Sequence, residues 1–268
     1  MKLRVFDNPD TLASAAAEQA AAAIREAIDA NGVARVVAAT GASQLAFLEA
    51  LTRHSEIAWA NVELFQLDEY LGLSDAHPAS FTKYIEERLV GKTEIVRYHA
   101  LDGTLDAAAL LREANRAIRT GPIDVAFAGI GENGHLAFND PPADFSIGES
   151  YILVNLDEAC RRQQVREGWF ANLADVPTRA ISMSVQQIVR AKQIVAVVPE
   201  QRKARAVRGC FEGPISPMAP ASILRTHANA TAYLDRGSAS LLEPKTLAQF
   251  ANGTAPEQYP IPASSVAT

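Results

Sequence analysis

Short apolar runs alternate along this chain with longer segments of helical periodicity, and this alternation limits the folds that the chain can adopt. The apolar runs predict strands at residues 3–6, 34–39, 62–67, 123–128, 151–156, 181–185, 193–198 and 230–234, with a short strand near His99. The segments between them predict helices at residues 10–31, 44–53, 79–90, 105–120, 157–170, 186–192, 201–212 and 219–224. Such alternation predicts an α/β fold with one doubly wound, mostly parallel sheet and helices on both faces.

The bulk composition limits the class of protein further. We expect a single domain at residues 1–252 and a loosely ordered C-terminal tail at residues 253–268, which is rich in Pro, Ala and Ser. The formal net charge is −6 without a long basic run, which argues against a nucleic-acid surface. No segment predicts a membrane span or a signal peptide, so we expect a cytoplasmic protein. Cys160 and Cys210 are far apart in the sequence and predict neither a disulfide framework nor a cysteine-rich metal site.

The segment GIGENGHLAFNDPP, residues 129–142, directly follows the predicted strand 123–128. Ligands bind at strand ends of this kind in open α/β sheets, and three glycines let the backbone come close to a ligand. His135 can exchange protons near neutral pH, and the nearby Asp140 would fix its tautomer. The alternative is a connector whose histidine makes only structural hydrogen bonds, but the glycines and the carboxylate together favour a proton-transfer site.

This segment also matches the dinucleotide-binding pattern GxGxxG. That pattern requires a helix to begin at the third glycine, so that the helix N-terminus receives the pyrophosphate. Here the chain continues from Gly134 to Pro141 and Pro142, which cannot extend a helix. We therefore do not predict a dinucleotide cofactor.

Two further segments place polar groups where a strand ends. Residues 40–43, Thr-Gly-Ala-Ser, lie between a predicted strand and a predicted helix, which predicts an anion site; an ordinary helix cap by Ser43 is the alternative. Asp68 and Glu69 directly follow the strand 62–67, which places Asp68 at the same sheet edge as His135 if the strands are parallel. Solvent-exposed surface acids are the alternative interpretation of this pair.

The sequence resembles the glucosamine-6-phosphate deaminase (isomerase) family, which is related to the 6-phosphogluconolactonases. The resemblance rests on FQLDEYLGL at residues 65–73, on residues 131–141, and on residues 203–213. It covers residues 3–234 and implies a Rossmann-like fold of the deaminase type. The implied reaction converts an amino-sugar phosphate into fructose 6-phosphate and ammonia without a metal or an organic cofactor. Family members occur both as monomers and as homo-oligomers.

The resemblance also implies the roles of individual residues. His135 would open the sugar ring, Asp140 would orient and polarise its imidazole, and Asp68 would carry the proton between C2 and C1 of the open chain. The candidate substrate- and phosphate-binding residues are Thr40, Gly41, Ala42, Ser43, Glu69, Gly131, Asn133, Gly134 and Lys203. We expect a small amino-sugar phosphate as the partner and a homo-oligomer as a possibility, with neither a nucleic acid nor a membrane.

The chain departs from the family pattern at three positions. It has Asn133 where an aspartate is frequent, Asp140 where a glutamate is frequent, and no clear phosphate-binding arginine near Glu167, although Arg166 and Arg162 are close in sequence. A paralogue that acts on galactosamine 6-phosphate or 6-phosphogluconolactone is therefore the alternative enzyme. A non-catalytic sugar-phosphate sensor is the alternative from another class, but the chain lacks the basic N-terminal helix-turn-helix that such regulators usually carry.

Overall fold

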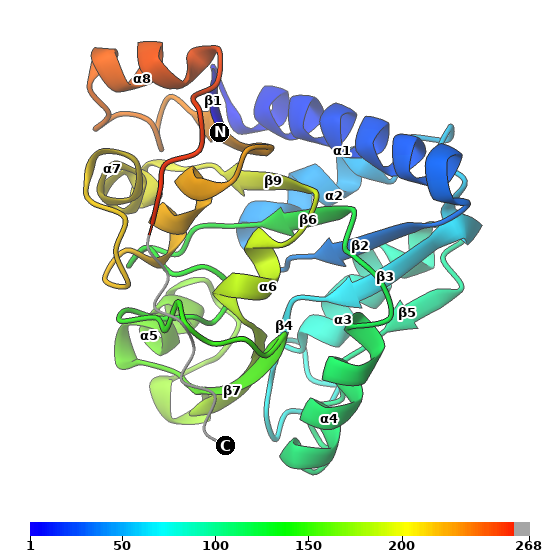
Figure 1. The fold of residues 1–268 in the computed structure, drawn as a ribbon. Coiled ribbons are helices and arrows are strands. Elements are labelled where there is room, and N and C mark those ends of the chain that lie inside the picture. The colour runs from blue at the N-terminus through cyan, green and yellow to red at the C-terminus, as the bar shows by residue number, and fades with distance from the viewer. Residues whose placement is uncertain (260–268) are drawn as a thin grey trace.

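A seven-stranded sheet forms the centre of the molecule, and every pairing in it is parallel. The computed structural model describes residues 1–259 of the chain, so residues 260–268 of the expected tail lie outside the described part. The strand order is β1-β10-β9-β6-β2-β3-β5. Figure 1 labels most of these strands. The strands are β1 (Lys2–Phe6), β2 (Ala34–Ala38), β3 (Val62–Gln66), β5 (Arg97–His99), β6 (Val125–Ala128), β9 (Gln193–Val198) and β10 (Ala230–Asp235). The predicted mostly parallel α/β fold is confirmed.

Helices lie on both sides of this sheet. The α-helices are α1 (Pro9–Asn31), α2 (Leu45–Leu51), α3 (Phe81–Arg88), α4 (Ala107–Ile118), α5 (Glu158–Arg166), α6 (Val185–Val189), α7 (Ala204–Glu212) and α8 (Pro244–Ala251). The 3-10 helices are η1 (Ala42–Gln44), η2 (Trp59–Asn61), η3 (Val90–Lys92), η4 (Leu173–Asp175), η5 (Gln201–Lys203) and η6 (Pro220–Thr226). In Figure 1, α1 and α2 lie on one side of the sheet and α6 on the other. The expected helix at residues 219–224 is thus a 3-10 helix, and α8 was not predicted.

Helix α1 shows how the local sequence sets an element. The side chain of Asn8 accepts a hydrogen bond from the backbone N–H of Thr11 and caps the helix, and Pro9 occupies the first turn, where no donor is needed. Gly32 ends the helix in a left-handed conformation with φ of 74°. The buried face is mostly alanine, so the helix packs closely over strands β2, β9 and β10.

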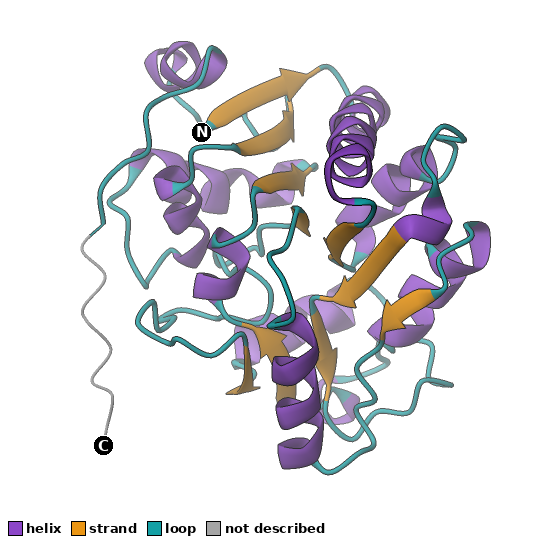
Figure 2. Ribbon diagram, turned by 45° about the vertical axis from the view of Figure 1, so that its right-hand side comes forward, coloured by secondary structure: helices purple, strands orange, loops and turns teal. Residues whose placement is uncertain are grey.

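A second sheet of antiparallel strands lies apart from the main sheet (Figure 2). It has three strands in the order β4-β8-β7. These strands are β4 (Asp68–Tyr70), β7 (Tyr151–Asn155) and β8 (Arg179–Met183). The expectation of one sheet that contains residues 151–156 and 181–185 was therefore wrong. Apolar runs show that a strand is buried, but they do not specify its partner. A separate apolar cluster around Tyr70, Phe138 and Phe170 packs beneath this sheet.

The strand order creates a crevice between β2 and β6. After β2 the chain next enters this sheet at β3, on one side, whereas after β6 it returns to this sheet at β9, on the other side, once it has formed two strands outside the sheet. The segments that follow these two neighbouring strands therefore diverge, which is where open α/β sheets bind ligands.

The two ends of the described chain lie together. The backbone N–H of Thr254 donates to the carbonyl of Met1 at 2.8 Å, and the side chain of Glu257 forms an ion pair with Arg225. These contacts join the first part of the expected tail to Met1 and Arg225 of the expected domain. Within residues 1–259, no helix has the length and apolar character needed to cross a membrane.

Candidate active site

A cavity lies at the carboxyl ends of β2, β3, β6 and β9, in the crevice described above. Its wall contains eight of the residues singled out from the sequence: Thr40, Gly41, Ala42, Ser43, Asp68, Gly131, His135 and Lys203. Because these residues come from four separate parts of the chain, the parallel sheet brings them together. Four candidates lie outside this wall: Glu69, Asn133, Gly134 and Asp140.

The turn at residues 40–43 is fixed from two sides. Gly41 has φ of 98°, which favours glycine, and its carbonyl accepts a hydrogen bond from the Tyr84 hydroxyl at 3.0 Å. The side chain of Gln44 donates to the carbonyl of Val197 on β9 at 3.2 Å. The predicted helix at residues 44–53 begins here as the 3-10 helix η1 before α2. The turn therefore presents a rigid backbone to the cavity.

Asp68 lies where the chain passes from the main sheet to the second sheet. It follows β3 and begins β4, where it pairs with Ser182 of β8. Burial raises the pKa of its carboxyl well above the usual value, and the adjacent charge of Glu69 raises it further. A carboxylate with a raised pKa is a stronger base, and Asp68 presents it to the cavity.

Glu69 points away from the cavity. Its carboxylate accepts hydrogen bonds from the backbone N–H of Thr82 at 2.8 Å and from the Ser80 hydroxyl at 2.9 Å, at the start of α3. Burial raises the pKa of this carboxyl. Our expectation that Glu69 contacts the substrate is not supported by this placement, because successive side chains of a strand point to opposite faces.

His135 and Asp140 are in contact. Nδ1 of the imidazole lies 3.1 Å from Oδ1 of Asp140, and Nδ1 has no aligned hydrogen-bond partner among the described residues. A small rotation of the ring would complete the bond, as is common in unliganded sites. Burial by itself would raise the pKa of Asp140, but His135 and the Asn133 amide lower it below its usual value. Asp140 is therefore an ionised carboxylate that faces the imidazole from behind the cavity wall.

Asn133 holds this pair in place. Its side-chain amide donates to Oδ1 of Asp140 at 3.0 Å, and its side-chain oxygen accepts from the backbone N–H of His135 at 3.0 Å. Oδ2 of Asp140 accepts from the backbone N–H of Asp157 at 3.2 Å. Asn133 thus bridges His135 and Asp140 and does not line the cavity. Gly134, between Asn133 and His135 in the sequence, adopts φ of 87°, and its carbonyl accepts from the backbone N–H of Ala221.

Lys203 ends η5 and is 3% exposed. Burial lowers the pKa of its ammonium, whereas the nearby carboxylate of Glu167 raises it in part. Among the described residues, Lys203 is the only lysine or arginine that lines the cavity. An anionic group of a ligand would therefore be held by this ammonium together with the turn at residues 40–43.

Residues 7–233 match the family described as glucosamine-6-phosphate isomerases/6-phosphogluconolactonase. The chain belongs to this family. It is 37% identical over 205 residues to a glucosamine-6-phosphate deaminase of Latilactobacillus sakei, covering 76% of this chain and 85% of the relative. It is 34% identical over 215 residues to a deaminase of the same name from Streptococcus pneumoniae, covering 80% and 89% of the two chains.

Solved structures of this family share the fold. A monomeric glucosamine-6-phosphate deaminase superposes with a TM-score of 0.83 at 31% identity, covering 90% of this chain and all of the other. A 6-phosphogluconolactonase from Neisseria gonorrhoeae superposes with a TM-score of 0.71 at 21% identity, covering 88% of this chain and 99% of the other. At this level of identity, the lactonase structure shows only that the two chains share a fold. The seven-stranded sheet with its surrounding helices is therefore the fold of the deaminase family.

The two arginines near the family's expected phosphate-binding position point elsewhere. Arg166 is exposed and pairs with Glu132 at 2.7 Å, and Arg162 is exposed and pairs with Glu158 one helical turn away. Neither lines the cavity; Glu167 does. This member of the family therefore has a carboxylate on the cavity wall and relies on Lys203 for positive charge there.

Sequence reasoning missed part of the cavity wall. Gln163, Gln164 and Glu167 of the α5 segment line it, as do two aromatic residues, Phe81 and Phe138. The polar sequence of α5 is typical of a solvent-exposed helix, and its proximity to Lys203 depends on tertiary structure. The signal in the sequence was the pair Gln163 and Gln164. An amphipathic surface helix would have apolar residues on its buried face, so polar residues at those positions indicate a polar cavity.

His135 on the cavity wall lies together with two side chains behind that wall, Asp140 and Cys160, in a cluster of possible metal ligands. One ligand atom each from His135, Asp140 and Cys160 lie within 4.8 Å of one another, a donor set that zinc accepts. Burial raises the pKa of the Cys160 thiol, and the charges of Asp140 and Asp157 raise it further, which opposes formation of the thiolate. We therefore derive no step of a reaction from a metal at this place.

Proposed function

We propose that this protein converts glucosamine 6-phosphate into fructose 6-phosphate and ammonia. The observation that supports this most directly is the single cavity that brings Asp68, His135, Lys203 and the turn at residues 40–43 together. Asp68 and His135 supply two groups that can transfer protons. Lys203 and the turn supply an anion-binding end of the cavity. The relatives named glucosamine-6-phosphate deaminase support the same substrate class, a small amino-sugar phosphate.

Ring opening is the first step that we assign. The anomeric hydroxyl must lose a proton, the ring oxygen must gain one, and the bond between C1 and that oxygen breaks. His135 is suited to this transfer, since an imidazole can both accept and donate a proton near neutral pH. The ionised Asp140, 3.1 Å from Nδ1, would stabilise the protonated ring that forms during the transfer.

Proton transfer along the open chain is the second step. Asp68 would remove the proton from C2 while the C1 carbonyl oxygen takes up a proton from the C2 ammonium group, which gives an enolamine. Asp68 would then return its proton to C1, which gives a C2 iminium group. One carboxylate can perform both halves if C1 and C2 present the same face to it. Burial and the charge of Glu69 raise the pKa of Asp68, so its carboxylate is a stronger base than a solvated one.

Hydrolysis of the iminium group completes the reaction. Water adds to C2, the bond between C2 and nitrogen breaks, and ammonia leaves as the C2 carbonyl of fructose 6-phosphate forms. During all three steps the phosphate would stay on Lys203 and on the turn at residues 40–43. We also retain the cytoplasmic location expected from the sequence, which is supported by the two free, buried thiols of Cys160 and Cys210.

The test is ammonia release by the purified protein. Glucosamine 6-phosphate should release ammonia, and Asp68→Asn should abolish the release because an amide cannot carry the proton. Galactosamine 6-phosphate and 6-phosphogluconolactone are assayed in parallel. Turnover of the lactone alone, undiminished in Asp68→Asn, would replace the proposal with a lactonase, and binding of all three without turnover would replace it with a sensor.

A further inference from the structure

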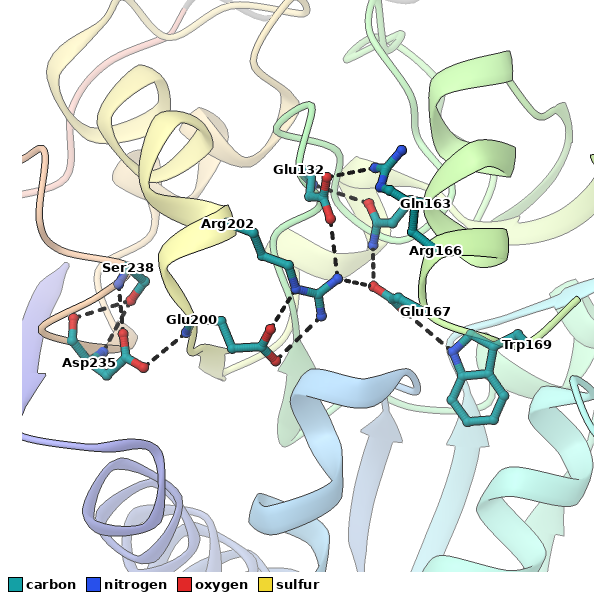
Figure 3. A network of polar contacts seen from close by, with 9 residues as sticks. All are labelled: Glu132, Gln163, Arg166, Glu167, Trp169, Glu200, Arg202, Asp235 and Ser238. Atoms are coloured by element: carbon teal, nitrogen blue, oxygen red, sulfur yellow. Dashed lines mark hydrogen bonds and ion pairs between the residues drawn. The ribbon is translucent and has the colours of Figure 1, made fainter.

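A fixed carboxylate stands on the cavity wall close to Lys203. The side chain of Glu167 is 7% exposed. Its Oε1 accepts from the amide of Gln163 at 2.8 Å, and its Oε2 accepts from the indole N–H of Trp169 at 3.2 Å (Figure 3). Burial by itself would raise the pKa of Glu167, but Arg202 and Gln163 lower it below the usual value. Glu167 is thus an immobile negative charge near the ammonium that would receive an anion.

Arg202 neutralises this carboxylate from the side away from the cavity. Its Nη1 lies 2.6 Å from Oε1 of Glu167 and 3.2 Å from Oε1 of Glu132, while its Nε lies 2.6 Å from Oε2 of Glu200. Figure 3 shows the guanidinium between these three glutamates. Arg202 does not line the cavity, whereas Glu167 does, so the carboxylate lies between the guanidinium and a ligand there.

We propose that Arg202 is a specificity-determining residue of this cavity, which makes the end beside Lys203 able to accept a phosphate by neutralising Glu167. Without Arg202, Glu167 would repel the phosphate and would compete with it for the ammonium of Lys203. With Arg202 paired to Glu167, that ammonium stays available to bind the anion. The proposal depends on the proposed function only in that the cavity takes a phosphate ester.

Calorimetric binding tests the proposal without turnover. The probes are inorganic phosphate and glucitol 6-phosphate, with glucitol as the phosphate-free control. Replacing Arg202 with methionine (Arg202→Met) should weaken binding of both phosphate probes about ten-fold, the scale of repulsion between neighbouring like charges at a partly solvated site. Glu167→Gln by itself should bind the phosphate probes at least as tightly as the wild type.

The double variant decides how Arg202 acts. If it acts through Glu167, Arg202→Met combined with Glu167→Gln should return phosphate affinity to within about three-fold of the wild type. A double variant as weak as Arg202→Met would overturn the proposal, since Arg202 would then act through Glu132 or Glu200, bind the anion itself or support the fold. Unchanged affinity in Arg202→Met would overturn it as well.

Two further variants separate charge from folding. Arg166→Met is the matched control, because Arg166 also pairs with Glu132 but does not contact Glu167; it should keep wild-type affinity. Arg202→Lys keeps the positive charge and should retain most of the affinity that Arg202→Met loses.

In the enzymatic assay, Arg202→Met should raise KM for the phosphorylated substrate with little change in kcat. Absence of deaminase activity would refute the proposed function while leaving this binding pattern measurable.

Discussion

Gly131 lies directly against the imidazole of His135. A Cβ atom at residue 131 would overlap the ring atoms Cδ2, Cε1 and Nε2. The backbone N–H of Gly131 also donates to the carbonyl of His135 at 3.0 Å, so the glycine loop folds back on the histidine. Gly131 therefore acts by leaving space for the ring, which fixes the position of the imidazole relative to the cavity.

Gly131→Ala should therefore displace the imidazole. We expect kcat for ammonia release to fall about 100-fold, the cost of misplacing a catalytic group by roughly 1 Å. Overpacking should also lower the free energy of unfolding by about 1–3 kcal/mol. Gly148→Ala is the control, because a Cβ there meets no atom within 4 Å. Wild-type kcat in Gly131→Ala would show that the ring position does not limit the reaction.

The parallel sheet explains why much of the cavity was predictable. Strand ends of a parallel sheet meet at one edge, so the ends of the strands at residues 34–39, 62–67 and 123–128 were enough to bring Asp68 and His135 together. The wrong prediction for the strands at residues 151–156 and 181–185 has an equally physical cause. Strand partners depend on long-range packing, which an apolar run does not encode.

Two features of the candidate site differ in how far the sequence specifies them. The period of two in a strand already implies that Asp68 and Glu69 face opposite sides, so the outward placement of Glu69 could have been predicted. The Glu167–Arg202 pair could not, because the two residues are 35 positions apart and neither segment has a pattern that specifies the other. Contacts of this kind arise only when α5 packs beside η5.

Asp140→Asn should slow catalysis without loss of binding. The amide cannot stabilise a protonated imidazole, and its NH₂ group would face either the donor amide of Asn133 or the backbone N–H of Asp157. We expect kcat to fall about 10²- to 10⁴-fold, the usual contribution of general acid–base catalysis, with KM within about three-fold. The exposed Asp144→Asn is the control. An equal rise in KM with unchanged kcat would instead assign Asp140 to substrate binding.

Lys203→Ala should act mainly on substrate affinity. Loss of a charge-assisted hydrogen bond to phosphate should cost about 1.5–3 kcal/mol, which is more than a ten-fold rise in KM. The same variant should bind inorganic phosphate weakly in calorimetry, whereas the exposed Lys92→Ala should behave as the wild type. An unchanged KM would remove Lys203 from the phosphate end of the cavity.

Glu69→Gln should shift the pH dependence of the reaction. Asp68 must be ionised to accept the C2 proton, so activity is lost as the pH falls through its pKa, which burial and the charge of Glu69 raise. Removing that charge should move the acidic limb of kcat/KM to lower pH.

The Glu69→Gln variant should also lose about 1–3 kcal/mol of stability, because a glutamine NH₂ would face the Thr82 backbone N–H or the Ser80 hydroxyl. Glu86→Gln, on the exposed face of α3, is the control. An acidic limb that stays in place in Glu69→Gln would show that burial alone sets the basicity of Asp68, and a limb at the pKa of a solvated carboxyl would remove Asp68 from the role of base.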